Sequence, residues 1–485
     1  MKKILLTGAS GYIGGNLLKE IKDDYQIVAA SRSTKNKENE QNVEWKKVDL
    51  FSIKDVENAM EGIDTAIYLV HSMQPSAKLT QASFVDMDAI LADNFGRAAK
   101  KQGVKHIIFM SGIMPHENAK DLSDHLRSRL ECEKILGSYS VPVSTLRAGL
   151  IIGPKGSSFP ILKKLTERLP ALVLPKWAYS KTAPVALKDV VKGLSALIER
   201  SPEENESIDI FHDVTDYKGM FKATAKVMGK KLPMMDLPII PVSITKPIVS
   251  LITEEPKELV YPLLDSLVHD MVPSKENYVE GITNAPTPLE ESIKTALEED
   301  KEGKKKPKKS ESIGRALKKS DVKSVQRITI PSSWSIDQTA NYYMNWLSRI
   351  GMSFINTAID GDTLSISLPI FKDPILILQK NKDYTDDDRV LFMIKGGKFS
   401  KTVKEGEEGR ARLEFRRVLD TNECIIAIHE YEPTLPWFIY KFTQARVHLI
   451  VMTLFGWETK ILEKTLDSTY LVDKGKKQKR LKSSL

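Results

Sequence analysis

The stretch KKILLTGASGYIGGNLL, residues 2–18, decides the fold of the first half of the chain. A short apolar strand runs into a glycine-rich turn, and a helix is expected to open at Tyr12. The glycines Gly8, Gly11 and Gly14 form a GxxGxxG pattern. Glycine permits the sharp turn and lets the backbone approach a pyrophosphate, which then sits at the helix N-terminus. The strand–turn–helix context therefore favours dinucleotide binding over a purely structural turn.

The second expected strand ends in the sequence ASRS, where the ribose of the adenosine half would lie. An acidic residue here would bind the ribose 2′-hydroxyl of NAD and repel a phosphate. Ser31 and Arg32 stand there instead, with Lys35 close behind. Arginine forms bidentate hydrogen bonds with phosphate, so the sequence favours NADP(H) over NAD(H). The alternative interpretation of Arg32 is a solvated surface residue. Asp49 and Leu50, which end the third expected strand, are placed to bracket the adenine.

Short apolar strands alternate with helical stretches through the first half of the chain. This alternation is typical of an α/β fold, a Rossmann-type doubly wound parallel sheet with helices on both faces, over residues 1–215. A Pro-rich helical region extends this NAD(P)-binding domain to 1–296, where a charged linker, 297–324, begins. Strands in series and a long helix then predict a separate α+β domain over 325–470, and 471–485 form a basic tail.

The composition indicates a soluble globular protein, because 41% of the 485 residues are hydrophobic and 28% are charged. Cys132 and Cys424 lie far apart, so we expect free thiols in a reducing compartment, and the cytoplasm is the expected location. Prolines interrupt the longest apolar stretch, 237–253, and no helix spanning a membrane is expected. No His, Cys, Asp and Glu set has metal-ligand spacing, so no metal is expected.

The net charge of +8 is concentrated in two segments. Residues 301–310 carry six lysines and one glutamate, and residues 474–485 carry six positive charges and no acid. The rest of the chain is slightly acidic, so no basic groove is expected on the folded parts. Since such runs are more often solvated than bound to nucleic acid, no nucleic-acid partner is expected.

Five motifs carry a resemblance to a known family: TGASGYIG, VDL, YLVHSM, NFGRAAKKQGVKHIIFMSG and STLRAGLIIGP. Together they resemble atypical or extended short-chain dehydrogenase/reductases of the NmrA-like kind, over about the first 215 residues. The stretches LSDHLRSR, SSFPILKKLTERLP and YPLLDSLVHD look like a bacterial subgroup with a fused C-terminal domain of unknown function. The end of the chain resembles that fused domain and, more distantly, the START/polyketide-cyclase (SRPBCC) helix-grip fold.

The resemblance implies roles for several residues. Arg32 would hold the 2′-phosphate and Asp49 would contact the adenine. The turn that begins at Arg147 would flank the nicotinamide. The residues implied to line the pyrophosphate are Gly8, Ser10, Gly11, Tyr12, Ile13 and Gly14, and those beside the ribose are Leu69 and His71.

The family's reaction needs a tyrosine as acid or base, a lysine four residues later and a serine on the preceding strand. Here Ser111 stands where that serine belongs, but His125 and Arg129 replace the tyrosine and the lysine. The i, i+4 spacing keeps the two side chains on one helix face. A histidine is an acid near neutral pH without help from lysine, and Arg129 would hold the cofactor ribose.

Three functions remain open at this point. The first is an NADPH-dependent oxidoreductase that reduces a small apolar carbonyl or enone, with Ser111, His125 and Arg129 as its catalytic residues. The second is an NADP(H)-binding sensor or assembly protein without turnover, and the third is a lipid-binding protein with an inactive nucleotide domain. The aromatic segment 437–457 is expected to pack in a core, or else to wall an apolar ligand site or touch membrane lipid, helped by the basic tail.

Overall fold

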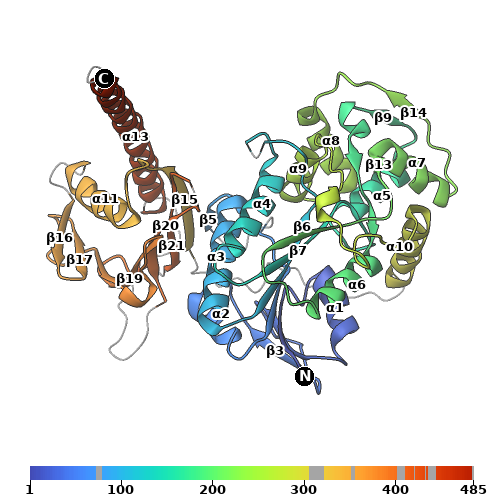
Figure 1. The fold of residues 1–485 in the computed structure, drawn as a ribbon, viewed down its shortest axis with the longest axis horizontal. Coiled ribbons are helices and arrows are strands. Elements are labelled where there is room, and N and C mark those ends of the chain that lie inside the picture. Colours follow the sequence, from blue (N-terminus) through green and yellow to red (C-terminus); the bar gives the residue numbers. More distant parts are fainter. Residues whose placement is uncertain are drawn as a thin grey trace. The chain divides into compact units, whose positions relative to one another are not determined.

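The computed structural model describes residues 1–72, 79–118, 120–304, 322–350, 355–400, 410–419, 421–431, 433–434 and 444–482. The chain divides into two compact units (Figure 1). The first unit comprises Met1–Gln74 and Asp88–Ser312, and the second comprises Pro75–Met87 and Ile313–Leu485. Each unit has its own hydrophobic core.

A seven-stranded parallel sheet forms the centre of the first unit, in the order β12-β7-β6-β4-β1-β2-β3. The order reverses between β1 and β4, and ligands of doubly wound folds bind at such a switch point. The predicted Rossmann-type fold is therefore confirmed. The strands are β1 (Lys3–Thr7), β2 (Gln26–Ser31), β3 (Val43–Lys47), β4 (Thr65–Tyr68), β6 (His106–Gly112), β7 (Val143–Ala148) and β12 (Glu206–Ile210).

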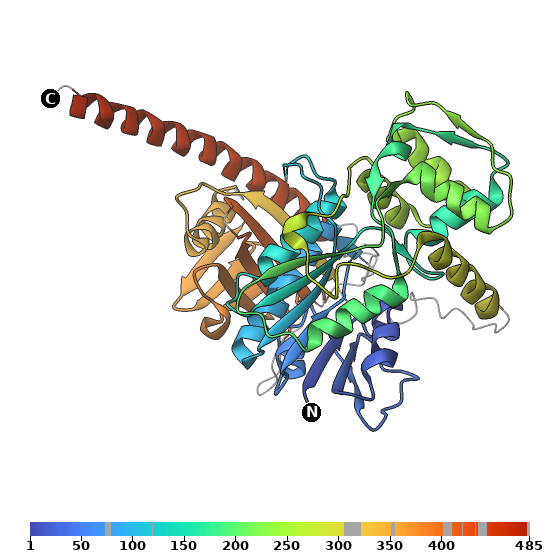
Figure 2. The same cartoon turned by 45° about the vertical axis from the view of Figure 1, so that its right-hand side comes forward.

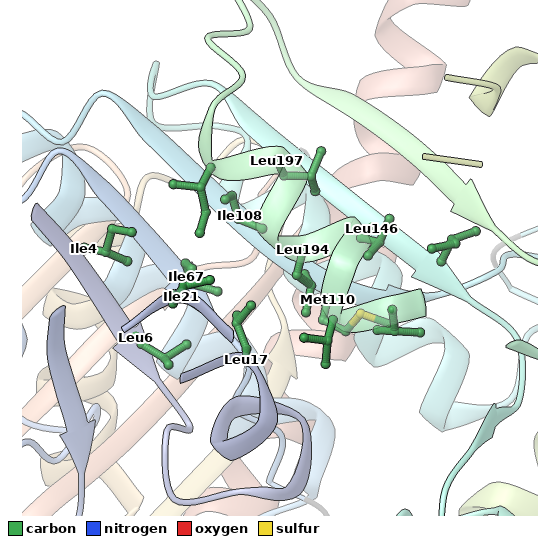
Figure 3. Packing of buried hydrophobic residues seen from close by; sticks show 14 of the residues in the cluster. Ile4, Leu6, Leu17, Ile21, Ile67, Ile108, Met110, Leu146, Leu194 and Leu197 are labelled. Atoms are coloured by element: carbon green, nitrogen blue, oxygen red, sulfur yellow. The ribbon is translucent and has the colours of Figure 1, made fainter. Parts of the chain in front are cut away.

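Helices cover both faces of this sheet (Figures 1 and 2). On one face, leucines and isoleucines of α1 (Tyr12–Ile21) and α6 (Leu187–Ile198) pack on the strands, as Figure 3 shows. On the other face lie α2 (Ile53–Ala59), α3 (Phe84–Gln102) and α4 (Asp124–Leu136). There, Tyr68 of β4 meets Phe95 of α3 edge to face, with ring centroids 4.9 Å apart. Burial on both faces explains why the inner strands β1, β2, β4 and β6 are mostly apolar, whereas the edge strands β3 and β12 carry charged residues.

A second layer of helices and short strand pairs follows the sheet and forms its own apolar cluster in the first unit. Its short pairs are β8 (Ile151–Ile152) with β11 (Val185–Ala186), β9 (Leu172–Leu174) with β14 (Met234–Asp236), and β10 (Lys181–Thr182) with β13 (Thr215–Asp216). Its helices are α5 (Phe159–Arg168), η1 (Lys176–Tyr179), α7 (Tyr217–Val227), α8 (Val242–Thr253), α9 (Lys257–Ser266), η2 (Lys275–Asn277) and α10 (Leu289–Lys304).

In its described residues, the second unit is an antiparallel sheet with two α-helices, as the sequence predicts for a separate α+β domain. The strand order is β16-β17-β18-β19-β20-β21-β15, and β5 (Leu79–Gln81) adds a parallel edge strand beside β15. The remaining elements are β15 (Val322–Thr329), α11 (Ile336–Ile350), β16 (Asn356–Asp360), β17 (Thr363–Ser367), β18 (Leu376–Lys380), η4 (Lys382–Tyr384), β19 (Arg389–Gly396), β20 (Arg412–Arg417), β21 (Glu423–Tyr431) and α13 (Gln444–Lys482).

Three predicted domain boundaries differ from the structure. Helix α10 continues to Lys304, so the predicted linker 297–324 begins too early, and its last residues already belong to β15. Glutamate and lysine are good helix formers, so a charged sequence here does not end the helix. The tail also begins as helix, because α13 extends to Lys482. Residues 75–87 belong to the second unit, although the sequence places them inside the first domain.

Aromatic rings fill the core of the second unit. Phe455 of α13 lies 4.9 Å from the ring of Tyr343 and 5.0 Å from that of Trp346, both on α11. Tyr343 also contacts Phe415 of β20, at 5.5 Å. Residues 437–443 of the predicted aromatic segment lie outside the described residues. Among those described, no helix combines the length and the apolar character that crossing a bilayer would require.

We predict that Phe455→Ala lowers the free energy of unfolding of the second unit by about 3–5 kcal/mol, because a fully buried ring is removed. Denaturant unfolding of the full chain, followed by fluorescence, measures this loss. The matched control is Trp457→Ala on the same helix, where the ring is 63% exposed and a change within about 0.5 kcal/mol is expected. Equal losses in the two variants would contradict the assignment of the helix faces.

Candidate functional site

The glycine-rich loop joins β1 to α1, and its backbone segments lie so close together that a side chain would clash. Gly8 has φ of +72°, and the amide of Gly11 donates to its carbonyl at 2.8 Å. A Cβ on Gly14 would lie 2.3 Å from that same carbonyl oxygen. Since Gly11 is the N-cap of α1 and has no side chain, the first amides of the helix are open to an anion. The loop therefore fits a pyrophosphate, as the sequence predicts.

Four other predicted residues surround this loop. Ser10 is exposed, and its hydroxyl accepts a hydrogen bond of 3.2 Å from that of Ser31 at the end of β2. Tyr12 turns its ring toward Gly153, where an added Cβ would lie 2.6 Å from the phenol oxygen. Burial, helped by the charge of Glu299, raises the pKa of Tyr12 to about 12, so the phenol stays neutral. Ile13 is half-buried against the sheet core.

The residues expected around the adenosine half fall into two groups. Arg32 is exposed directly after β2, at the same edge of the sheet as the glycine loop, and Lys35 is exposed nearby. Asp49 is half-buried, and its carboxylate accepts from the amide of Phe51 at 3.1 Å. Leu50, by contrast, is only 7% exposed. Leu50 is therefore placed as a core residue more than as an adenine contact.

A buried acid that sequence reasoning missed holds His71. The carboxylate of Asp88, on α3, is 2.6 Å from Nδ1 of His71 and accepts from the amide of Ser72 at 2.8 Å. The hydroxyl of Ser128 on α4 donates to it at 3.0 Å. Burial opposes ionisation of Asp88, but the imidazole of His71 and its hydrogen bond outweigh it and lower the pKa of this carboxyl. An acid inside the apolar stretch FVDMDAIL is the only sequence signal for it.

His125 lies beside His71 and is neutral at physiological pH. The two rings stack with centroids 5.2 Å apart, and Nδ1 of His125 is 3.2 Å from the hydroxyl of Ser266 on α9. Burial first, and then the charges of His71 and Arg129, lower the pKa of His125 to about 3. The charged form of His125 is therefore disfavoured at this place, and its role as an acid stays a prediction. His125 remains a neutral group that donates or accepts one hydrogen bond per ring nitrogen.

Arg129 points into the protein, contrary to its predicted contact with the cofactor ribose. The side chain is 6% exposed, and its guanidinium donates to the carbonyl of Met110 at 2.7 Å. The same group lies 4.6 Å from the ring centroid of Phe109. Arginine lengthens the side chain beyond lysine and presents several donors, so it reaches the β6 backbone. Its role is to hold α4 on the sheet.

Arg147, which the resemblance places beside the nicotinamide, forms an ion pair inside the protein. Its guanidinium forms a two-pronged ion pair with Glu133 of α4, at 2.6 and 3.2 Å. Ser207 of β12 donates to the same carboxylate at 2.6 Å. The strand end that follows is tight, because a Cβ on Gly149 would lie 2.4 Å from the carbonyl oxygen of Ala183.

Ser111 is the predicted catalytic residue whose polar group remains available. It is the last residue but one of β6, beside Arg147 in the sheet register, and it is 6% exposed. Within the described residues its buried hydroxyl has no hydrogen-bond partner. An unpaired buried hydroxyl is costly, so a native one calls for an explanation such as a ligand atom.

The end of α9 and the residues after it contact the start of α4. The amide of Ser123, the N-cap of α4, donates to Nε2 of His269 at 3.2 Å, and Nδ1 of His269 is 2.8 Å from Glu117. Since Nε2 accepts, Nδ1 carries the proton and donates to Glu117. The hydroxyls of Ser123 and Ser266 are 3.0 Å apart. These contacts join residues more than a hundred positions apart, and the sequence gives no signal for them.

We predict that the free energy of unfolding falls at acid pH because His125 is held neutral in the folded chain. Its pKa is about 3 in the folded chain against an ordinary value of 6.5, so the folded form binds fewer protons between these values. The associated stability is complete above pH 6.5 and is lost as the pH falls toward 3. His125→Asn should reduce the loss of unfolding free energy between about pH 7 and pH 5 by about 2 kcal/mol, measured by urea unfolding.

The control for this experiment is His116→Asn, since His116 lies in an exposed loop of the same unit. Its pH dependence should match that of the unchanged protein. If the stability of the His125→Asn variant depends on pH as that of the unchanged protein does, His125 is not the source of the loss of stability at acid pH.

Comparison with known proteins agrees with this geometry. Residues 8–141 match the NAD(P)H-binding family. Auxiliary protein GraX of Staphylococcus aureus is 37% identical over 146 residues, 30% of this chain and 43% of that protein. An NmrA-like family domain-containing protein of Dictyostelium discoideum is 29% identical over 165 residues, 32% of this chain and 51% of that protein. The chain thus spans about half the length of these two relatives.

More distant similarities extend over a longer part of the chain. The UDP-glucose 4-epimerase of Vibrio cholerae is 23% identical over 263 residues, 49% of this chain and 79% of that protein. The structure of the Citrobacter sp. triphenylmethane reductase complexed with NADP(H) aligns at 18% identity with a TM-score of 0.47, covering 61% of this chain and 100% of that one. The first unit thus contains a segment that matches an NAD(P)H-binding family, on a fold of the Rossmann type.

Proposed function

We propose that the chain is an NADP(H)-dependent oxidoreductase that reduces an apolar carbonyl or enone. The observation that carries the proposal is the buried hydroxyl of Ser111, which lacks a partner within the described residues at the end of β6. A hydroxyl at this position is suited to donate to a substrate oxygen. NADPH, when bound, supplies the hydride.

The choice of NADP(H) over NAD(H) rests on Arg32. This arginine is exposed after β2, beside the hydrogen-bonded pair of Ser31 and Ser10, and no acid stands in that position. A guanidinium there favours a 2′-phosphate by a charge-assisted, two-pronged hydrogen bond. The open amides at the start of α1 favour the pyrophosphate of either cofactor.

The chemistry of the site differs from the usual tyrosine and lysine pair. Neutral His125 is proposed to orient or polarise the substrate oxygen by hydrogen bonding, together with Ser111, and not to deliver a proton as an imidazolium. Asp88 fixes the ring of His71, against which His125 stacks, so the orientation of His125 is set by two elements. The proton that completes reduction of the oxygen then comes from water.

A second candidate function is an NADP(H)-binding sensor without turnover. The inward position of Arg129 favours it, because this side chain contacts a backbone carbonyl and leaves the ribose without the cation that the family supplies. Binding through the glycine loop and Arg32 would persist in such a protein. The two candidates therefore share the cofactor and differ in whether the bound cofactor is consumed.

For the second unit we propose a helix-grip fold. In its support, one strand and one helix precede six antiparallel strands, and a long helix follows. A lipid cavity in this unit has less support, because the rings of Tyr343, Trp346 and Phe455 contact one another between α11, α13 and the sheet. A lipid-binding function with an inactive nucleotide domain is accordingly the weakest of the three hypotheses.

We predict that Arg32→Ala weakens binding of NADPH by about 10- to 150-fold and leaves NADH unchanged, because a charge-assisted hydrogen bond to the 2′-phosphate is lost. Calorimetric titration with both cofactors measures this. The matched control is Lys105→Ala. It removes an exposed cation that precedes β6, at the amino ends of the strands, whereas Arg32 lies at their carboxyl ends. Equal weakening of NADPH and NADH by Arg32→Ala would contradict the assignment.

We predict that Ser111→Ala lowers kcat for NADPH oxidation by about 10²–10³-fold without changing NADPH affinity, because one hydrogen bond to the developing oxyanion is lost. A panel of quinones, enones and aldehydes, followed at the NADPH absorbance, measures it. Ser138→Ala, at the far end of α4, is the control and should keep full activity. Tight NADPH binding with no oxidation across the panel would instead support the sensor.

A further inference from the structure

We propose that α13 of the second unit binds the surface of an anionic lipid bilayer. This helix has two apolar faces on opposite sides. One face packs on the unit's own sheet through Met452, Phe455 and Thr459, which are at most 2% exposed. The other face is not covered by the described structure.

The uncovered face carries a stripe of exposed apolar side chains. Val447 and Ile450 are each 58% exposed, Trp457 is 63% exposed and Ile461 is 62% exposed. These four positions are three, seven and four residues apart, so they share one side of the helix, opposite the buried set. Large apolar side chains grouped this way on an exposed helix mark an interaction surface, whereas single exposed ones do not.

The charges on the helix are distributed in favour of a negative surface. Of the four acids on α13, Glu458 accepts from the hydroxyl of Tyr342 at 2.8 Å and Glu463 from the amide of Asn422, while Asp467 and Asp473 lie further along the helix, beyond the stripe. Lys460 and Lys464, in contrast, are exposed. Cations beside an apolar stripe that contains tryptophan are typical of helices that lie in the interface of an anionic membrane.

The same helix continues into the most basic segment of the described chain. Residues 474–482 read KGKKQKRLK, with six positive charges and no acid, and α13 extends through them to Lys482 (Figure 2). A cluster of four to eight basic residues on an amphipathic helix is a recognised mode of binding anionic lipid. The helix is not suited to cross the bilayer, so it would lie along the surface.

A second copy of the chain is a poorer occupant of the stripe. Two such helices would bring together two sets of exposed lysines and two segments of six cations, and like charges across an interface oppose pairing. A coiled-coil partner would need acids beside the apolar positions, and here Glu458 and Glu463 are used inside the unit. A bilayer with anionic lipid complements both the stripe and the charge.

The test is cosedimentation of the full-length protein with vesicles of equimolar phosphatidylglycerol and phosphatidylcholine. Binding is expected, and it should fall at least about tenfold with pure phosphatidylcholine or with the double change Lys476→Gln and Lys477→Gln. The double change Ile450→Ser and Ile461→Ser should also weaken binding at least about tenfold. Trp457 should be quenched by brominated lipid in the unchanged protein.

The matched control replaces two isoleucines of the same unit that are equally exposed but lie away from α13. Ile359→Ser and Ile370→Ser, at 59% and 76% exposure, should leave vesicle binding unchanged. Equal unfolding transitions of both double variants establish that the fold is intact. The proposal is overturned if the anionic vesicles do not bind, or if the variant at 450 and 461 binds as well as the control. A dimer in light scattering that this variant dissociates would also overturn it, since the second copy would then cover the stripe.

Discussion

The close approach of Gly14 to the carbonyl of Gly8 is the constraint on which the first unit depends. A single added Cβ at Gly14 would come within 2.3 Å of that oxygen, so α1 meets β1 at this angle only with glycine in place. The angle leaves the first amides of α1 open and sets them beside the end of β2, where Ser31 bonds to Ser10. The proposed pyrophosphate loop and the place of Arg32, which is proposed to select the cofactor, therefore follow from one backbone contact.

The contacts around His125 are organised by charged side chains that face inward. Arg129 and Arg147 each fix α4 to the sheet, one through the carbonyl of Met110 and the other through Glu133. Asp88 adds a third connection, because it accepts from Ser128 of α4 while holding His71. These contacts keep the half-buried His125 next to another imidazole, and its charged form is thereby disfavoured. In the reductase that we propose, His125 in place of the tyrosine would therefore act by hydrogen bonding and not by proton delivery.

Local signals in the sequence predict much of this architecture. The alternation of strands and helices indicates the parallel sheet, the glycine spacing locates the anion loop, and the serial strands indicate the antiparallel second unit. What the sequence does not reveal depends on contacts between distant positions. The edge strand at residues 79–81 pairs with Val322 and its neighbours, and Ser266 reaches His125 across 141 positions. Asp88 is an ordinary acid in a helical pattern until the fold buries it.

The central claim is that the first unit holds NADPH with its reactive ring beside Ser111 and a neutral His125. The most direct measurement is a crystal structure of the full chain with NADPH. We predict that the 2′-phosphate contacts Arg32 and that the nicotinamide C4 faces an open pocket bounded by the Ser111 hydroxyl and the His125 ring. A nicotinamide turned away from Ser111, or a Ser111 hydroxyl bonded to the protein in that complex, would contradict the account.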